Sequence, residues 1–352
     1  MTTPSTPSTP SAGVHPPGLD LARFGAWFVD TVPSVNRAEL SARLIAGGRS
    51  NLTYEVTDGT DRWIVRRPPL GHVLATAHDM GREHRVISAL GDAPVPVPRT
   101  YGLCQDPSVL GAPFYVMEAV NGTPYRRADE LAVLGPVRTR AISEALVDTL
   151  AQLHDVDPAA AGLGDFGRPE GFLERQVRRW RKQLDASYCR DLPAAQQLYD
   201  RLAASVPPHS PTGIVHGDYR LDNVLVDDQD RPVAVIDWEM ATLGDPLTDV
   251  GLLALYTRVG ALAGGAAVAD ASSAPGFLTE EEMLARYADR SRHDLSDLAF
   301  HLGLAAFKLA VILEGIHYRH LQGQTVGPGF DQVGAVVQPL LEIGLDSLKE
   351  HR

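Results

Sequence analysis

Residues 216–246 read HGDYRLDNVLVDDQDRPVAVIDWEMATLGDP and are the most informative stretch of this 352-residue chain. Eight carboxylates surround two short apolar runs, NVLV and VAVI, which a polar DDQD segment and a proline separate. Two such runs joined by turn residues predict a β-hairpin. Asp227, Asp228 and Asp230 would lie in its turn, where aspartate is favoured because its side chain bonds to nearby backbone. The other carboxylates need a different explanation.

Two oxygen-bearing side chains flank the predicted hairpin at the end away from its turn. If the turn centres near residue 230, Asn223 and Asp237 lie opposite each other. Directly opposed residues of a hairpin have Cα atoms about 4.5–5.5 Å apart. Mg²⁺ prefers oxygen ligands and commonly takes one or two from the protein, with phosphates and water as the others. The pair is therefore a candidate magnesium site.

The residues before the hairpin form a spaced motif. Asp218 stands five residues before Asn223, in the pattern H-G-D-x-x-x-x-N that begins at His216. With its following aspartate, this pattern resembles the catalytic loop H-R-D-x-x-x-x-N of the protein-kinase-like superfamily. The glycine in place of arginine is similar to the aminoglycoside phosphotransferase and choline kinase branch. The continuation VIDWEMATLGDPLTDVG most resembles members that also occur fused to acyl-CoA dehydrogenases, and the resemblance covers roughly residues 40–345.

The resemblance implies a role for each residue of the motif. Asp218 would accept or orient the proton of a substrate hydroxyl, and Asn223 and Asp237 would hold Mg²⁺ on the phosphates of ATP. Arg220 takes the place of the catalytic-loop lysine, where a cation can stabilise the phosphoryl group in transit. His216 would brace the loop by hydrogen bonds. Each residue alone would more often be a surface acid or a turn residue, so the interpretation rests on the combined spacing.

A kinase-like N-lobe also needs a glycine turn over the phosphates. Residues 42–67 predict a strand, a glycine turn, a second strand, a DGTD turn and a third strand. The first turn holds Gly47, Gly48, Ser50 and Asn51. It lacks the G-x-G-x-x-G pattern, and an ordinary hairpin turn is the alternative.

The third strand should supply a cation, and the next helix a glutamate that braces it. Arg66 takes the place of lysine in V-A-I-K, and no lysine occurs before Lys182. Arginine can clamp a phosphate, although it is larger than lysine. Arg67 is the rival candidate, and strand alternation would point it the opposite way. Glu83, in a segment of helical pattern, would brace the cation; a helix-surface charge is the alternative.

The segment FYVMEAVNG, residues 114–122, resembles the hinge between the two lobes. Adenine would take backbone hydrogen bonds near Glu118 and Val120, and Met117 would flank it. These expectations rest on the resemblance, because backbone contacts leave almost no signal in a sequence.

The chain is expected to divide into a tail and two lobes. The Thr-Pro-Ser repeat of residues 1–17 cannot build a core and predicts a disordered tail, without the regions of a secretory signal. Residues 18–117 would form a small lobe with an antiparallel sheet and one internal helix. Residues 118–352 would form a larger, mainly helical lobe. Further expectations are helices at 19–32, 75–90, 138–157 and 175–184, a small-residue mobile loop at 260–277, and a capping box of Thr279 and Glu282.

Charge and composition limit the functional classes. The net charge of −12 argues against nucleic acid as a partner, and all of it arises after residue 117. It indicates either an acidic soluble surface or a cleft that attracts a cation. The apolar segment 299–318 carries His301, Lys308 and Glu314 and predicts a buried helix, not a membrane span. Two cysteines without metal-site spacing suit the reducing cytoplasm.

Together these features predict a two-lobed, protein-kinase-like α+β fold with ATP between the lobes. The expected activity is a Mg²⁺-ATP-dependent transfer of phosphate to a hydroxyl of a small molecule. Three features favour a small molecule over a protein: the HGD form, the missing A-P-E segment, and the GDP sequence after the metal aspartate. A nucleotide-binding module without turnover is one alternative. A metal hydrolase built on His216, Asp218 and Asp237 is another, but it lacks further histidines at ligand spacing.

The acceptor stays open at this point. A polycationic aminoglycoside would suit the acidic second lobe, with Asp245, Asp249 and Glu314 as candidate contacts. Each of these acids is equally well explained as a cap or a surface residue. A hydroxyacyl-CoA-type metabolite would instead need cations, which the basic segment 175–182 could supply.

Overall fold

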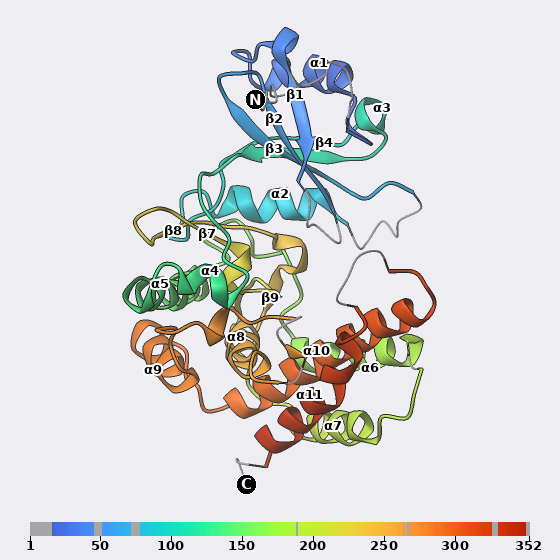
Figure 1. Ribbon diagram of the computed structural model, residues 1–352, viewed down its shortest axis with the longest axis vertical. Helices are drawn as coiled ribbons and strands as arrows, with labels where there is room; N and C mark the ends of the chain where they lie inside the picture. The colour runs from blue at the N-terminus through green and yellow to red at the C-terminus, as the bar shows by residue number, and fades with distance from the viewer. Residues whose placement is uncertain are drawn as a thin grey trace, which may run out of the picture. The chain divides into compact units, whose positions relative to one another are not determined.

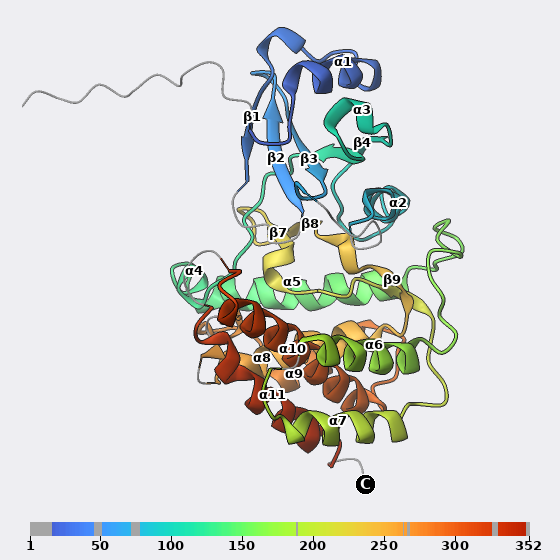
Figure 2. The ribbon, with the colours of Figure 1, turned by 90° about the vertical axis from the view of Figure 1, so that its right-hand side faces the viewer.

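The structure, a computed structural model, describes residues 16–45, 51–71, 78–187, 189–262, 264–265, 268–325 and 330–349. The chain forms two compact units. The first runs up to Ser88 and includes Arg99–Ala119, and the second comprises Ala89–Pro98 and the chain from Val120 onward. Figures 1 and 2 show the strands of the first unit and the mainly helical second unit from two directions.

The first unit is built on a five-stranded antiparallel sheet in the order β1-β2-β3-β5-β4. The sequence predicted its first three strands and the strand that leads to the hinge. Its elements are α1 (Leu21–Thr31), η1 (Arg37–Glu39), β1 (Ser41–Leu44), β2 (Leu52–Thr57), β3 (Arg62–Arg67), α2 (Met80–Ala89), β4 (Thr100–Cys104), α3 (Pro107–Leu110) and β5 (Phe114–Glu118).

Strand alternation separates two functions on β3. Successive side chains of a strand point to opposite faces of the sheet. Trp63 lies on the face that α1 covers, where its ring centroid is 5.2 Å from that of Phe28. Arg67 shares that face and donates hydrogen bonds to the carbonyls of Gly18 and Leu110. Arg66 therefore points to the other face, toward α2.

The predicted tail lies almost wholly outside the described residues. Its last two residues, Pro16 and Pro17, are described and are held in place, contrary to the expectation of disorder up to residue 17. Leu19 N–H donates to the Pro16 carbonyl at 3.1 Å, and the hydroxyl of Tyr54 donates to the Pro17 carbonyl. The described chain thus begins attached to the sheet.

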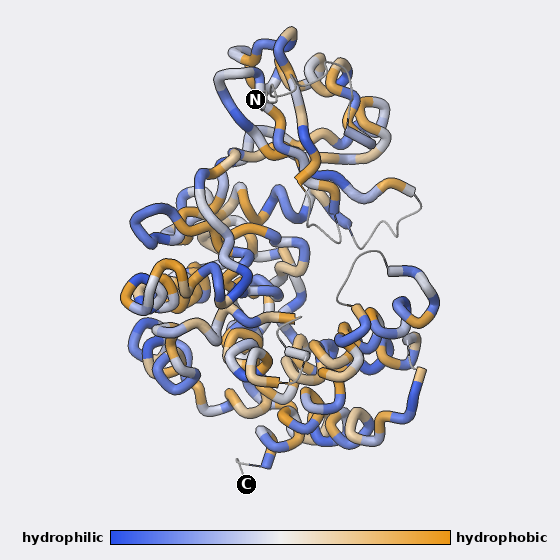
Figure 3. Tube along the Cα trace, viewed as in Figure 1, coloured by the Kyte–Doolittle hydropathy of each residue, from blue (hydrophilic) through white to orange (hydrophobic). Residues whose placement is uncertain are grey.

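The second unit holds most of the helices, as the sequence predicted. Its hydrophobic core is formed by α6, α7, α8, α10 and α11, and the mixture of polar and apolar residues along the outer helices can be followed in Figure 3. Its elements are α4 (Ala128–Ala132), α5 (Pro136–Asp155), α6 (Phe172–Ser187), α7 (Pro193–Ala204), β6 (Gly213–Val215), η2 (Leu221–Asn223), β7 (Val224–Val226), β8 (Pro232–Val235), η3 (Trp238–Met240), β9 (Thr242–Gly244), α8 (Leu247–Val259), η5 (Ala271–Ser273), α9 (Glu280–Arg290), α10 (Leu298–Leu321) and α11 (Val333–Ser347).

Helix α10 is the apolar segment noted in the sequence. Among the described residues, it alone is long and apolar enough to cross a membrane by length and composition. Of its most apolar 18-residue window, 89% is buried inside the protein, as in the core helix of a globular unit. It packs against α6, α7, α8 and α11. The predicted buried helix is therefore present.

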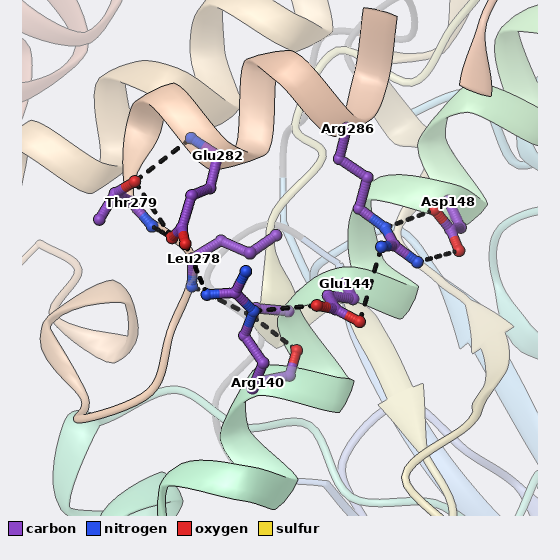
Figure 4. Close-up of polar contacts among 8 residues, drawn as sticks. Arg140, Glu144, Asp148, Leu278, Thr279, Glu282 and Arg286 are labelled. Atoms are coloured by element: carbon purple, nitrogen blue, oxygen red, sulfur yellow. Dashed lines mark hydrogen bonds and ion pairs between the residues drawn. The ribbon is translucent and has the colours of Figure 1, made fainter. Parts of the chain in front are cut away.

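The predicted capping box is confirmed at the start of α9. Thr279 Oγ1 accepts from Glu282 N–H at 3.2 Å, and the Glu282 carboxylate accepts from Thr279 N–H at 2.9 Å. Figure 4 shows how this cap joins an ion-pair network that fastens α9 to α5. Arg140 of α5 bridges Glu144 and Glu282 at 2.9 and 2.8 Å, and Arg286 of α9 binds Asp148 at 2.7 Å.

Two other predicted segments are only partly described. The helix expected at 75–90 begins at Met80 in the structure, and residues 72–77 lie outside the described part. The segment 260–277 includes the short turn η5, which the sequence did not predict. Asp270 beside this turn accepts from Ala128 N–H at 3.1 Å, and Ser272 donates to the Tyr256 carbonyl at 3.1 Å.

Candidate functional site

The loop between β6 and η2 carries the H-G-D motif, and His216 braces it from inside. The His216 side chain is fully buried. Its Nδ1 accepts from Asp218 N–H at 3.2 Å, so Nε2 carries the proton and donates to the Ile236 carbonyl at 3.0 Å. Its ring centroid lies 4.6 Å from that of Trp238. The expected bracing by hydrogen bonds is confirmed, and both ring nitrogens are used, so His216 is no metal ligand here.

Asp249 of α8 fixes the backbone of the same loop. Its buried carboxylate accepts from His216 N–H at 2.6 Å and from Gly217 N–H at 2.8 Å. His154 Nε2 lies 3.4 Å from the same carboxylate. Burial alone would raise the pKa of Asp249, but the hydrogen bonds that its carboxylate accepts, from the His154 side chain first and from the His216 backbone, outweigh burial and hold this pKa low. The loop is thus anchored on an ionised carboxylate.

The glycine of the motif has a steric explanation. Gly217 has φ of +84°, in the region that glycine tolerates and other residues rarely adopt. A Cβ atom there would lie 2.8 Å from both the Cβ and the carbonyl oxygen of Met240. A larger residue at this position would therefore need the loop and the turn η3 to move apart.

Asp218 and Asn223 are in direct contact. The Asn223 side-chain nitrogen donates to the Asp218 carbonyl at 2.9 Å and to its carboxylate at 3.2 Å. Both hydrogen bonds use the amide nitrogen. The amide oxygen, which is the atom that would ligate a metal, therefore makes no hydrogen bond to Asp218. The hydroxyl of Tyr256 lies 3.5 Å from the other carboxylate oxygen of Asp218. The candidate base is thus oriented by two side chains.

The hairpin exists, but its register differs from the prediction. Val224 pairs with Val235, so Asn223 lies opposite Ile236, whose N–H donates to the Asn223 carbonyl at 2.9 Å. Asp237 is one residue farther along. The cause is the turn, which centres on residue 229, since Asp227 N–H donates to the Arg231 carbonyl at 2.9 Å; an irregularity between Leu225 and Val226 then shifts the pairing by one residue.

Asp237 has an unusual backbone conformation. Its φ of 66° and ψ of 59° place it in the left-handed region, at the start of η3. A residue other than glycine is uncommon there and often occurs at functional sites. One of the turn aspartates behaves as predicted: Asp227 accepts from Gln229 N–H and Arg231 N–H, each at 2.9 Å. The Asp230 carboxylate instead binds Arg138, at 2.7 Å.

Arg220 is held by neighbours within the second unit. Its guanidinium binds Asp222, lies 4.7 Å from the ring centroid of Tyr256, and donates to the Val268 carbonyl at 3.3 Å. Burial would lower its pKa, but Tyr256, Asp222 and Asp218 together raise it, so the group stays protonated. These contacts fix one orientation of the Arg220 side chain. Its role in stabilising the phosphoryl group stays a prediction.

In the first unit, Arg66 and Glu83 form the pair that the resemblance implied. Arg66 Nε lies 3.1 Å from the Glu83 carboxylate, and both side chains are largely buried. Glu83 also accepts from the Asn51 amide at 2.9 Å and from the Tyr115 hydroxyl at 2.9 Å. Glu83 is therefore no helix-surface charge, and Asn51, expected in a phosphate turn, contacts this buried glutamate. Arg67 lies on the opposite face of the sheet, where its guanidinium donates to main-chain carbonyls.

The other nucleotide candidates are placed less completely. Gly47, Gly48 and Ser50 lie outside the described residues. Met117 is buried in the sheet beside Ile64. The N–H of Glu118 donates to the Arg99 carbonyl at 2.8 Å, so the sheet uses one of the backbone groups of this residue. Val120 is half-buried and belongs to the second unit.

The acids considered for binding a cationic acceptor are all internal. Asp245, Asp249 and Glu314 are at most 1% exposed. Asp245 lies 3.1 Å from His301 and accepts from the Ser210 hydroxyl at 2.8 Å. The Glu314 carboxylate binds Arg190 at 2.6 Å. These acids hold the fold together, and none of them is a surface residue.

Two neighbours of Asp218 escaped the reasoning from sequence. Tyr256 leaves no signal, because it is one aromatic residue within an apolar helix. Lys308 did leave one, a lysine within an apolar segment, but it served only as an argument against a membrane span. Its ammonium donates to the carbonyl of Gly217. In the described part of the chain, no group of three or more His, Cys, Asp or Glu side chains is placed to hold a metal ion.

Comparison with known proteins decides the family. The phosphotransferase enzyme family matches residues 41–287, which is more than half of the chain. The chain belongs to this family. It is also 35% identical over 328 residues to acyl-CoA dehydrogenase family member 11 of Gallus gallus, covering 90% of this chain. The match spans 41% of that relative, so the chain corresponds to less than half of its length.

Structures of this phosphotransferase family share the fold. A Ralstonia eutropha JMP134 protein, provisionally named an aminoglycoside phosphotransferase, has a TM-score of 0.82 and 32% identity, covering 94% of this chain and 98% of that one. A thermostable mutant of aminoglycoside phosphotransferase APH(4)-Ia, crystallised with AMP-PNP and hygromycin B, has a TM-score of 0.60. It is 18% identical, covers 92% and 98% of the two chains, and shows the fold alone. The predicted family and kinase-like α+β fold are confirmed.

Proposed function

We propose that this chain is a Mg²⁺-ATP-dependent phosphotransferase that phosphorylates a hydroxyl group of a small molecule. One observation carries the proposal: the Asp218 carboxylate is oriented by the Asn223 amide on a loop that Asp249 anchors through two backbone N–H groups. A carboxylate so fixed can receive a proton from an acceptor hydroxyl. Membership of a phosphotransferase family and the fold shared with a nucleotide-bound relative support the reaction type.

The proposed transfer balances within the active site. Asp218 takes the proton of the acceptor hydroxyl, and the hydroxyl oxygen bonds to the γ-phosphorus of ATP. The bond from the γ-phosphorus to the bridging oxygen breaks, and ADP leaves. Phosphoryl transfer of this kind depends on positioning and charge neutralisation more than on covalent chemistry.

The residues present fit a magnesium site. Asn223 keeps its amide oxygen clear of Asp218, and Asp237 offers a half-buried carboxylate. One amide oxygen and one carboxylate suit Mg²⁺, which retains phosphate and water ligands. The ion would neutralise charge on the nucleotide phosphates.

Arg66 is the proposed phosphate-binding cation of the first unit. Glu83 holds its guanidinium, and Tyr115 and Asn51 in turn fix Glu83. A cation that is already oriented loses less side-chain entropy when it binds a phosphate. The adenine-binding roles of Met117, Glu118 and Val120 remain part of the proposal.

The acceptor is more consistent with a neutral or anionic molecule than with a polycation. The three acids that could have met an aminoglycoside are buried and occupied. A hydroxyacyl-CoA-type thioester is the second candidate. Helix α6 exposes the cations Arg178, Arg179 and Lys182, which suit the phosphates of such a molecule. The similarity to a relative named as an acyl-CoA dehydrogenase family member also favours an acyl-CoA-type acceptor.

The test is ADP release from Mg²⁺-ATP in the presence of a panel of acceptors. The panel comprises aminoglycosides, macrolides, amino alcohols and hydroxyacyl-CoA thioesters. We expect turnover with one class, strongest for an anionic or neutral acceptor. Binding of AMP-PNP, measured by calorimetry with Mg²⁺ and with EDTA, needs no acceptor. Absence of Mg²⁺-dependent nucleotide binding would overturn the proposal, whereas binding without turnover on a wide panel would support the non-catalytic module.

A further inference from the structure

Lys308 is an unusual residue for its position. The chain has three lysines, Lys182, Lys308 and Lys349. Lys182 and Lys349 are exposed, whereas Lys308 is 8% exposed and sits in the middle of the apolar helix α10. Moving an ammonium out of water costs several kcal/mol unless hydrogen bonds and opposite charges offset it. The surroundings of the ammonium should therefore show what keeps it there.

The Lys308 ammonium contacts the catalytic loop and helix α6, which contains the basic segment. It donates a hydrogen bond to the carbonyl of Gly217, the residue immediately before Asp218. It lies 5.7 Å from the ring centroid of Trp180, a buried residue of α6. The compact ammonium of lysine suits so enclosed a position better than a planar guanidinium would.

Lys308 and Asp249 hold the same glycine from its two sides. Asp249 accepts from Gly217 N–H at 2.8 Å, and Lys308 donates to the Gly217 carbonyl. The carbonyl belongs to the peptide bond that also contains Asp218 N–H, which donates to His216. Both peptide groups around Gly217 are thereby fixed, although glycine itself has the freest backbone of any residue. These bonds therefore set the orientation of the Asp218 backbone, and with it the direction in which the Asp218 side chain points.

The charged groups around Lys308 come from three elements. Asp218 of the loop and Asp249 of α8 attract the ammonium, and Arg179 of α6 repels it. Burial is the strongest influence and lowers the pKa of Lys308, while the two carboxylates oppose that shift. The protonated form is thus the one that the carboxylates favour.

We propose that Lys308 is a positioning residue for the phosphotransfer reaction, which fixes the Gly217–Asp218 peptide and so orients the candidate base. This inference rests on the proposed function, because it names the residue that Lys308 serves. Lys308 need not touch the acceptor or the nucleotide for this role. A displacement of about 1 Å in a catalytic group can lower a rate by about 100-fold.

The kinetic test compares three substitutions at this position. Lys308→Met keeps the length of the side chain and removes the donor. Lys308→Gln keeps a hydrogen-bond donor without the charge, and Lys308→Arg keeps the donor and the charge. We expect Lys308→Met to lower kcat about 100-fold with KM for ATP within about twofold of the wild type. Lys308→Gln should recover at least tenfold of that loss, and Lys308→Arg should recover less, because the planar guanidinium fits the enclosed position less well. The exposed Lys349→Met serves as the control and should retain wild-type kcat.

A second measurement needs no acceptor. Hydrogen–deuterium exchange reports the backbone N–H groups of His216, Gly217 and Asp218, all of which are hydrogen-bonded in the loop. Lys308→Met should raise their exchange rates about tenfold, with little change in α7. Wild-type kcat together with wild-type exchange in Lys308→Met would overturn the inference. Absence of turnover in the wild type would count against the proposed function alone, since the exchange result would still decide the role of Lys308.

Discussion

Arg66 stands where the pattern V-A-I-K has lysine, and its contacts explain how arginine fits. The Glu83 carboxylate faces Nε of Arg66 at 3.1 Å, while Tyr115 holds the glutamate from β5. A guanidinium carries five N–H donors in a planar fork, which suits a phosphate group. The neighbouring Arg67 cannot substitute, because it points to the opposite face and binds main-chain carbonyls.

Replacing Arg66 should affect nucleotide binding in a graded way. Arg66→Met should raise the Kd for Mg²⁺-AMP-PNP at least tenfold, since a hydrogen bond to a charged group contributes about 1.5–3 kcal/mol. Arg66→Lys should stay within about threefold of the wild type, because the cation remains. Arg62→Met, at a more exposed position on the same strand, is the control. Calorimetry would contradict this role if Arg66→Met bound the nucleotide as tightly as the wild type.

At the scale of elements, α9 depends on its first turn. The Thr279–Glu282 box satisfies backbone donors that a helix start leaves unpaired. Glu282 also binds Arg140, so the cap and the contact with α5 share one side chain (Figure 4). Tyr287 makes a further contact between α9 and α5, because its hydroxyl lies 2.7 Å from His154 Nδ1. The position of α9 therefore matters for the interior that supports the catalytic loop.

Removing the cap should weaken the fold without abolishing it. Thr279→Ala should lower the free energy of unfolding by about 1 kcal/mol, which is typical of a lost N-cap. Asp289→Asn, 78% exposed at the far end of α9, should change it little. Urea unfolding of the three proteins measures the difference. An unchanged midpoint for Thr279→Ala would show that the cap is not a determinant of stability.

The elements also show where reasoning from sequence ends. Hydrophobic spacing predicted α1 and α5, because periodicity reports local burial directly, and two apolar runs around turn residues predicted the hairpin. The hairpin register was wrong by one residue, since the run of polar residues in the turn does not show that the turn centres on residue 229. The three acids were left open as cap, surface or ligand, because burial of Asp249 depends on distant segments meeting. Lys308 could be noticed in the sequence, but its partner Gly217 lies 91 residues away.

At the scale of the whole molecule, stability should depend on pH through buried histidine. His154 is fully buried between Tyr287 and Asp249, and burial lowers its pKa. The unfolded chain takes up a proton on this histidine near pH 6.5, while the folded chain does so only at lower pH. Between these two values the unfolded state binds more protons, so the free energy of unfolding falls as the pH falls. Above pH 6.5 this contribution to the pH dependence vanishes.

His154→Gln should reduce that dependence. Between pH 7.5 and pH 5.5, the wild type should lose about 1 kcal/mol more than the variant, since one pKa unit corresponds to about 1.4 kcal/mol. The comparison uses the change with pH within each protein, so a general loss of stability in the variant does not obscure it. His209→Gln, at an exposed position, should behave as the wild type. Equal pH dependence in all three proteins would contradict a neutral, buried His154.

The central claim is that Asp218 serves as the base of a phosphotransfer reaction. Its most direct test is acceptor-dependent ADP release at saturating Mg²⁺-ATP, measured for the wild type, Asp218→Asn and Asp228→Asn. Loss of a general base should lower kcat by about 10²–10⁴-fold in Asp218→Asn, with unchanged affinity for Mg²⁺-AMP-PNP. Asp228→Asn, exposed in the hairpin turn, should keep wild-type turnover. Wild-type turnover in Asp218→Asn would show that this carboxylate is not the base.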